Sequence, residues 1–273
     1  LNMLKVLSYF VINNQTPHLV LPIGTFNTDI KPFLSLNEQG VVNDKKYNQF
    51  IERYKKGELY EKVSILISEW ADGGDLLEYI KKNNNKMSIK EWRVIFFQIL
   101  SALSVIQSKY PSFRHNDLKA NNILIQKIGS RNKNNQFKYK INDKTYIIPN
   151  IGIQIKIWDF DFACIKGVVD NTKVDAKWTD KININSEMNR YYDLHYFFNT
   201  LTRKGFFPEF WKSKNVPKLV KEFVRRIIPE KYTNGDNIAE RGRILINDEY
   251  TYADKILKED EFFNKLRPDN EKV

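Results

Sequence analysis

The sequence predicts an α+β fold, in which a few short strands come before a largely helical part. Short apolar runs typical of strands lie at residues 19–26, 63–67, 123–126 and 154–158. From about residue 186 onward, the apolar residues recur mainly at helical spacing. Strands followed by helices indicate an α+β arrangement.

The composition is that of a folded chain without a disulfide framework. The 273 residues are 42% hydrophobic and 14% aromatic, which is enough apolar material for one large domain or two small ones. This content excludes a disordered chain. Cys164 is the single cysteine, so no intrachain disulfide forms. No apolar run approaches the ~18 residues of a membrane span, and the first residues lack the basic-then-apolar order of a signal peptide. We therefore expect a cytoplasmic protein.

The chain is basic, with 44 Lys and Arg against 33 Asp and Glu and a formal net charge of +11. Such an excess suits a solvated surface rich in Lys and Asn, or else a partner with negative charge. The positive charge is scattered, and the five tryptophans form no stripe with basic residues. We therefore expect no nucleic-acid partner.

The N-terminal part is expected to form two strands around a polar insertion. A helix is expected at 1–12. The strands are expected at 19–26 and 63–67, and the insertion at 27–61 contains one helix near 47–55.

Two capping boxes mark helix starts further along the chain. Asp75 and Glu78 open one helix, and Ser88 and Glu91 open the strongest helix of the sequence. Pro111 ends that helix. Three further helices are expected at Met188–Leu201, Val216–Ile228 and Tyr250–Leu266.

A basic insertion at residues 127–150 separates the strands at 123–126 and 154–158. It is rich in Lys, Arg and Asn. We expect a solvated loop, and a contact surface for acidic partners is the less favoured alternative.

The loop at 115–122 and the end of a later strand carry residues that suit phosphoryl transfer. Asp159 follows the strand at 154–158, so pairing of the two strands would bring it beside Asn122. An amide and a carboxylate oxygen are hard ligands suited to Mg²⁺. Asp117 is then left to accept a proton from a hydroxyl, and Lys119 to neutralise charge on the transferred group.

An Asp in a loop is usually a turn residue, but the ordered set is hard to obtain by chance. It reads His-x-Asp-x-Lys-x-x-Asn, followed about forty residues later by Asp-Phe. With it the sequence resembles the protein-kinase superfamily, whose catalytic loop is H-R-D-L-x-x-x-N and whose metal motif is D-F-G. Residues 64–80 and 191–195 extend the resemblance, which covers roughly residues 5–230. By its Asn-Asp catalytic loop, its Asp-Phe-Asp motif and its composition rich in Asn, Lys and Ile, the sequence resembles the serine/threonine kinases of poxviruses and other large cytoplasmic DNA viruses.

The resemblance implies a bilobal kinase fold and a protein-kinase reaction. Residues 1–70 would be a remnant of the small lobe with the insertion at 27–61, and residues 71–273 a mostly helical large lobe. The cofactors would be ATP and Mg²⁺, or Mn²⁺, and the acceptor a Ser or Thr hydroxyl of a protein. Lys119 is typical of kinases that act on proteins. A viral protein of this kind is expected in the host cytoplasm or the virion.

The resemblance also implies roles for particular residues. The expected catalytic residues are Asp117, the base, and Lys119, which contacts the transferred phosphate. The expected metal ligands are Asn122 and Asp159. The expected nucleotide contacts are Glu69 and Ala71 (backbone groups to adenine), Asp75 (ribose) and Leu124 (beneath the adenine). His115 and Phe160 are expected to pack together, and Asp193 to hold the catalytic loop from beneath.

Three departures from the kinase pattern matter. The 273 residues contain no glycine-rich loop and no strand lysine. Because Leu1 is not a methionine, we expect the chain to be a piece of a longer protein. Asn116 stands where kinases have the Arg that binds an activation-loop phosphate. We therefore expect activity that does not depend on activation-loop phosphorylation.

Two alternatives to a protein kinase stay open. A pseudokinase scaffold, or binding module, would also lack the glycine-rich loop and the strand lysine. A small-molecule kinase is the second alternative, and Lys119 argues against it.

Overall fold

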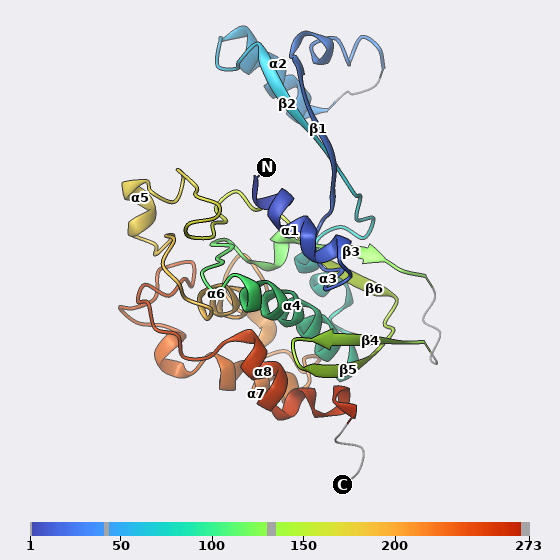
Figure 1. Ribbon diagram of the computed structural model, residues 1–273, viewed down its shortest axis with the longest axis vertical. Coiled ribbons are helices and arrows are strands. Elements are labelled where there is room, and N and C mark those ends of the chain that lie inside the picture. Colours follow the sequence, from blue (N-terminus) through green and yellow to red (C-terminus); the bar gives the residue numbers. More distant parts are fainter. Residues whose placement is uncertain (1, 41–43, 130–134, 269–273) are drawn as a thin grey trace. The chain divides into compact units, whose positions relative to one another are not determined.

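Helices and three small antiparallel strand pairs make up the fold in a computed structural model, which describes residues 2–40, 44–129 and 135–268 (Figure 1). This mixture confirms the expected α+β class. The chain divides into two compact units. The smaller unit is Leu21–Glu69, and the larger unit combines Leu1–Val20 with Trp70–Val273.

The elements have the following bounds. The α-helices are α1 (Asn2–Ile12), α2 (Lys45–Lys55), α3 (Leu76–Asn83), α4 (Ile89–Lys109), α5 (Lys177–Asp180), α6 (Tyr192–Leu201), α7 (Lys218–Ile227) and α8 (Ala253–Glu259). The strands are β1 (Pro22–Asp29), β2 (Lys62–Ser68), β3 (Ile123–Lys127), β4 (Gln136–Ile141), β5 (Lys144–Pro149) and β6 (Ile153–Ile157). The 3-10 helices are η1 (Lys31–Phe33), η2 (Ala120–Asn122), η3 (Pro208–Phe210), η4 (Glu230–Tyr232) and η5 (Glu261–Leu266).

The smaller unit is a two-stranded ribbon with one helix. Strands β1 and β2 pair antiparallel, with Phe26 opposite Ile65. Helix α2 begins after Asp44, whose side chain accepts a hydrogen bond from the backbone N–H of Tyr47 at 2.8 Å. Both strands and this helix are where the sequence predicts them, within a few residues.

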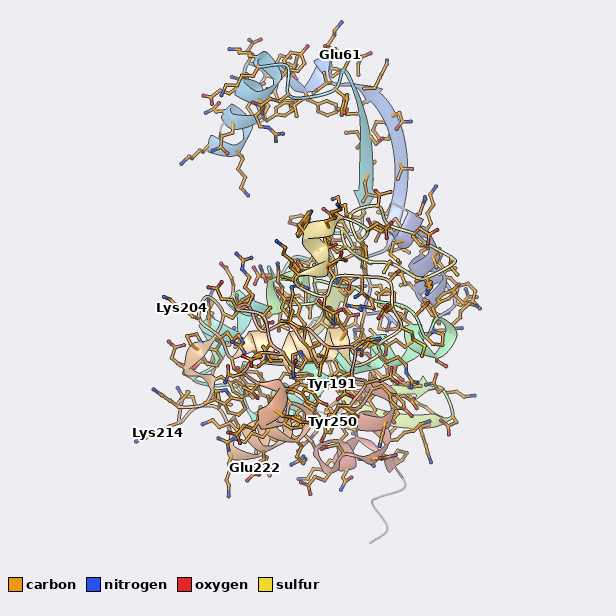
Figure 2. The ribbon with its side chains drawn as sticks, turned by 90° about the vertical axis from the view of Figure 1, so that its left-hand side faces the viewer. Glu61, Tyr191, Lys204, Lys214, Glu222 and Tyr250 are labelled. Atoms are coloured by element: carbon orange, nitrogen blue, oxygen red, sulfur yellow. The ribbon has the colours of Figure 1, made fainter. Side chains whose placement is uncertain are left out.

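Helix α4 is the centre of the larger unit. The capping box at its start is complete, because the side chains of Ser88 and Glu91 each accept a hydrogen bond from the other's backbone N–H. Helices α7 and α8 and strands β4 and β6 contact α4 (Figure 1). Aromatic side chains fill the core, where the rings of Phe96 of α4 and Phe198 lie 4.8 Å apart between centroids. At the edge of the core, the buried ring of Tyr191 lies 5.7 Å from that of the exposed Tyr250 (Figure 2).

The N-terminal residues belong to the larger unit. Leu7 and Phe10 of α1 are buried in its core. The backbone N–H of Val20 donates to the Ile157 carbonyl at 3.3 Å, and the Ile157 N–H donates to the His18 carbonyl at 2.9 Å. The units therefore differ from the expected division at residue 70, because the apolar face of α1 packs on the larger core.

The basic insertion is a hairpin, so the expectation of a solvated loop is wrong over residues 136–149. Strands β4 and β5 pair antiparallel, with Tyr139 opposite Tyr146. Alternate side chains point into the core, where Tyr139, Ile141, Tyr146 and Ile148 are buried. Lys138 and Lys140 lie on the other face of β4 and are exposed. Residues 130–134 of this insertion lie outside the described residues.

The expected C-terminal helices are present in shortened form. Helix α6 starts at Tyr192 because the side chain of Asn189 accepts the N–H groups of Tyr191 and Tyr192. Helix α7 lies within the expected bounds, and the third helix is divided at Asp260 into α8 and η5. Within the described ranges, no helix combines the length and apolar character needed to cross a membrane.

Candidate active site

The loop at 115–122 is fixed from below by a buried carboxylate. Asp193, in the first turn of α6, accepts the backbone N–H of His115 at 2.7 Å and that of Asn116 at 2.9 Å. The Asp193 side chain is fully buried, and burial raises its pKa, against the two N–H donors that favour the carboxylate. The expected anchoring of the loop by Asp193 is confirmed.

Asp117 is surrounded by donors on both of its oxygens. Its Oδ2 lies 2.8 Å from Nζ of Lys119 and accepts Nδ2 of Asn122 at 3.0 Å. Its Oδ1 accepts a hydrogen bond from Nη2 of Arg243. The side chain is only 11% exposed, so these contacts act with little screening by solvent. Three of the four residues expected to carry the chemistry are therefore in direct contact.

The pairing of two strands positions the backbone at Asn122 and Asp159. Asn122 comes directly before β3, and Asp159 comes two residues after the end of β6. Strands β3 and β6 are antiparallel, and Ile123 lies opposite Ile157. Beyond this pair, the Trp158 N–H donates to the Asn122 carbonyl at 3.0 Å, so Asp159 is one residue away from that contact. The structure brings these positions together as expected, although β4 and β5 lie between the two strands in the chain.

The side chains of Asn122 and Asp159 have oxygens available for a cation. Nδ2 of Asn122 donates to the carbonyl of Asp117 at 2.9 Å and to its Oδ2, which leaves Oδ1 as an acceptor. Among the described residues, the Asp159 carboxylate has no hydrogen-bond or ion-pair partner, and Asp159 adopts a left-handed φ of 60°. No group of three His, Cys, Asp or Glu side chains in those residues could hold a metal. Amide and carboxylate oxygens are hard donors of the kind that Mg²⁺ takes, and Mg²⁺ needs few protein ligands.

The metal motif is supported by the loop that precedes it. The rings of His115 and Phe160 lie 5.0 Å apart between centroids, which confirms their expected packing. Nε2 of His115 is 2.9 Å from the Trp158 carbonyl. The carboxylate of Asp161, where kinases have Gly, pairs with Nζ of Lys173 at 2.8 Å.

The segment after the metal motif is tied to residues beside Asp117. Nδ2 of Asn116 donates to the carbonyls of Phe162 and Asn185, at 3.0 Å each. The guanidinium of Arg114 is buried, donates to Oδ1 of Asn185 at 2.6 Å and lies 3.8 Å from the Tyr192 ring centroid. Asn116 therefore contacts this segment through neutral hydrogen bonds. The Arg that kinases have at this position would instead bind a phosphate on the segment.

The expected nucleotide contacts have different surroundings. Ala71 is buried, and Asp75 caps α3 by accepting the Glu78 N–H at 2.9 Å. Leu124 is half-buried, on the face of β3 opposite to the core residues Ile123 and Ile125. This leaves the Leu124 side chain at the surface of the larger unit, as a contact with a ring would require.

Glu69 ends the smaller unit, whereas Ala71 belongs to the larger one. The Glu69 carboxylate accepts the Leu21 N–H at 2.7 Å, and its own N–H donates to the Leu21 carbonyl at 2.9 Å. The backbone N–H and the carboxylate of Glu69 are therefore both engaged by Leu21.

Arg243 is a site residue that sequence reasoning missed. It lies 126 residues after Asp117, in the irregular segment between α7 and α8. No local pattern or spacing marks it, because only the tertiary fold brings the two residues together.

The chain resembles known viral kinases over most of its length. The family model described as poxvirus serine/threonine protein kinase matches residues 6–265. A protein of Acanthamoeba polyphaga mimivirus, whose name assigns it to the serine/threonine-protein kinases, is 53% identical over 98% of this chain and 58% of its own length. Serine/threonine-protein kinase 2 of fowlpox virus is 30% identical over 89% of this chain and 50% of its own length. The chain thus spans about half the length of these relatives. It belongs to the poxvirus serine/threonine protein kinase family.

Proposed function

We propose that this chain carries the phosphoryl-transfer site of a serine/threonine protein kinase. The observation that carries the proposal is the contact of Asp117 with both Lys119 and Asn122, beside the strand pair that places Asp159. The family relationship supports the reaction class. In this proposal Asp117 supplies the base, Lys119 the cation, and Asn122 and Asp159 the two oxygen ligands that phosphoryl transfer needs.

In this proposal Asp117 orients the acceptor hydroxyl. Its Oδ2 accepts a hydrogen bond from the hydroxyl and receives the proton as the hydroxyl oxygen attacks the γ-phosphorus of ATP. The bond from that phosphorus to the β,γ-bridging oxygen breaks, and ADP leaves. Lys119 places its ammonium group against the oxygens of the transferred group, where negative charge is concentrated. Asn122 holds the Asp117 carboxylate through Nδ2 and presents Oδ1, with Asp159, to the divalent cation. That cation, when bound, would neutralise phosphate charge.

Lys119 favours a protein acceptor over a small molecule. It makes a 2.8 Å ion pair with the proposed base and is 22% exposed, so its ammonium group can reach a ligand without leaving the site. The relatives named as serine/threonine-protein kinases point to the same acceptor class.

The central test replaces the base. In the protein with all of its natural flanking sequence, Asp117→Asn should lower transfer from ATP to protein Ser or Thr by about 10²–10⁴-fold. Asp236→Asn changes an exposed carboxylate outside the site and is the matched control. Full turnover by Asp117→Asn would contradict the proposal. A parallel panel of small alcohols, phosphorylated in place of protein, would instead establish a small-molecule kinase.

Nucleotide-binding and transfer assays on the same full-length protein distinguish a kinase from a pseudokinase scaffold. The observation that favours it is the lack of a glycine-rich loop and strand lysine within the 273 residues. Mg-ATP at 100 times its dissociation constant should stabilise a nucleotide-binding protein by about 2.7 kcal/mol. Asp159→Asn should weaken the Mg²⁺-dependent part of that effect. Nucleotide binding without measurable transfer would favour the scaffold.

A further inference from the structure

Arg243 makes a direct, buried contact with the proposed base. Nη2 donates to Oδ1 of Asp117, and Nη1 donates to the Asn116 carbonyl and, at 3.1 Å, to the Tyr192 hydroxyl. The guanidinium carbon lies 3.9 Å from the Tyr196 ring centroid. The Arg243 side chain is 7% exposed, so the ion pair with Asp117 is buried on both sides.

The backbone on either side of Arg243 is held in place. The Gly242 carbonyl accepts Nδ2 of Asn199 at 2.9 Å, and the Ile244 carbonyl accepts Nδ2 of Asn183 at 3.0 Å. Gly242 has a φ of +88°, and a Cβ there would lie 2.5 Å from Nε of Arg203. This position therefore requires glycine, and the guanidinium is delivered from a backbone with little freedom to move.

Lys119 cannot be the lasting partner of Asp117 if it also serves the phosphate. Its side chain is more exposed than that of Arg243, at 22% against 7%, and it ends in a point charge on a flexible stem. When Lys119 turns towards a phosphate, Arg243 is the cation that stays on the carboxylate. Its planar fork also links Oδ1 of Asp117 to the carbonyl of Asn116, which fixes the carboxylate against the loop backbone.

Resting on the proposed function, we propose that Arg243 is a positioning residue for the base: it holds Oδ1 of Asp117 so that Oδ2 faces the acceptor hydroxyl. It touches neither substrate nor cofactor and acts through Asp117. Because a misplacement of about 1 Å can cost about 10²-fold in rate, loss of this contact should appear in kcat. The KM for ATP should change little, because in this proposal Arg243 acts only through Asp117.

The experiment is a double-mutant cycle in the protein with its natural flanking sequence. Arg243→Gln should lower kcat by about 10- to 100-fold. Combined with Asp117→Asn, the same change should alter kcat by no more than about twofold, because the group on which it acts is gone. Arg241→Gln, an exposed arginine two residues away, is the matched control and should leave kcat unchanged.

Two further measurements keep the test decisive if Arg243→Gln folds poorly. Arg243→Lys keeps the charge but lacks the fork, so it should fold and still lose kcat. Methylguanidinium should raise the kcat of Arg243→Ala and leave that of Asp117→Asn unchanged. Thermal unfolding confirms that each variant is folded.

Different failures overturn different claims. Two results would overturn the positioning role and leave the kinase site intact. One is an unchanged kcat in folded Arg243 variants. The other is a loss of kcat on Arg243→Gln that is as large in the Asp117→Asn background as in the original protein. Unchanged transfer by Asp117→Asn alone would overturn the proposed function.

Discussion

At the residue scale, the buried carboxylate of Asp193 determines the shape of the candidate catalytic loop. It accepts two backbone N–H groups, from His115 and Asn116. Asp193→Ala would leave both donors buried without a partner, and each such donor costs about 1–3 kcal/mol. We expect a loss of about 2–6 kcal/mol in the free energy of unfolding.

Urea unfolding of the Asp193 variant measures this loss. Asp180→Ala, which changes an exposed carboxylate in α5, is the control. A stability equal to that of the control would show that the loop holds its shape without Asp193.

Two buried histidines should make the protein sensitive to mild acid. Burial lowers the pKa of His18 from 6.5 to about 3 and that of His195 from 6.5 to about 4. The folded state therefore binds fewer protons than the unfolded state. The stabilisation is complete above pH 6.5 and is lost as the pH falls towards the folded values.

The expected slope is up to about 1.4 kcal/mol per pH unit for each histidine. Urea midpoints between pH 7 and pH 5 measure it. His18→Gln should reduce the slope, because one of the two contributions is gone. An unchanged slope in this variant would mean that His18 is protonated in the folded protein.

At the element scale, the hairpin of β4 and β5 is part of the core. Ile148 is fully buried, whereas Lys140 on the same hairpin is exposed. Ile148→Ala should therefore destabilise the protein by about 2–5 kcal/mol, and Lys140→Ala should stay within about 0.5 kcal/mol. Chemical denaturation compares the two variants. Equally small losses of stability would show that the hairpin contributes little to the core.

The segment after Asp159 is attached to the loop without a phosphate. Asn116 bonds the carbonyls of Phe162 and Asn185, and the backbones of Arg114 and Cys164 exchange two hydrogen bonds of 3.0 and 2.9 Å. We therefore expect phosphatase treatment of the protein to leave its transfer rate unchanged. A large fall in rate, reversed by rephosphorylation, would show that a phosphate orders this segment.

At the scale of the whole molecule, nearly all buried apolar side chains of the described residues belong to the larger unit. Ile30 and Tyr47 are the buried apolar residues among those described in the smaller unit, and a two-stranded ribbon is marginal by itself. The ends of the smaller unit meet, since the Glu69 N–H donates to the Leu21 carbonyl. A short Gly-Ser linker can therefore replace residues 22–68.

We expect this deletion to leave a cooperative thermal transition within about 5 °C of the intact chain, because about 1 kcal/mol shifts the midpoint of a large domain by 2–4 °C. Differential scanning calorimetry measures it. Loss of the cooperative transition would show that the larger unit depends on the smaller one.

Patterns within short stretches of sequence were enough for most elements. The capping box of Ser88 and Glu91 predicted the start of α4, and strand-like runs predicted β2, β3 and β6 near their observed bounds. The signal failed for the hairpin, where Lys and Asn between the buried residues of β4 and β5 resembled a solvated loop. Composition counts charges and does not register that alternate side chains face the core.

The sequence by itself determined the α+β class, the kinase resemblance and the order of Asp117, Lys119, Asn122 and Asp159, because these depend on residue types at short spacing. Only the tertiary structure decided that α1 joins the larger unit and that Arg243 binds Asp117. Such contacts join residues far apart in the chain, and burial and charge pairing between them arise only once the core has packed.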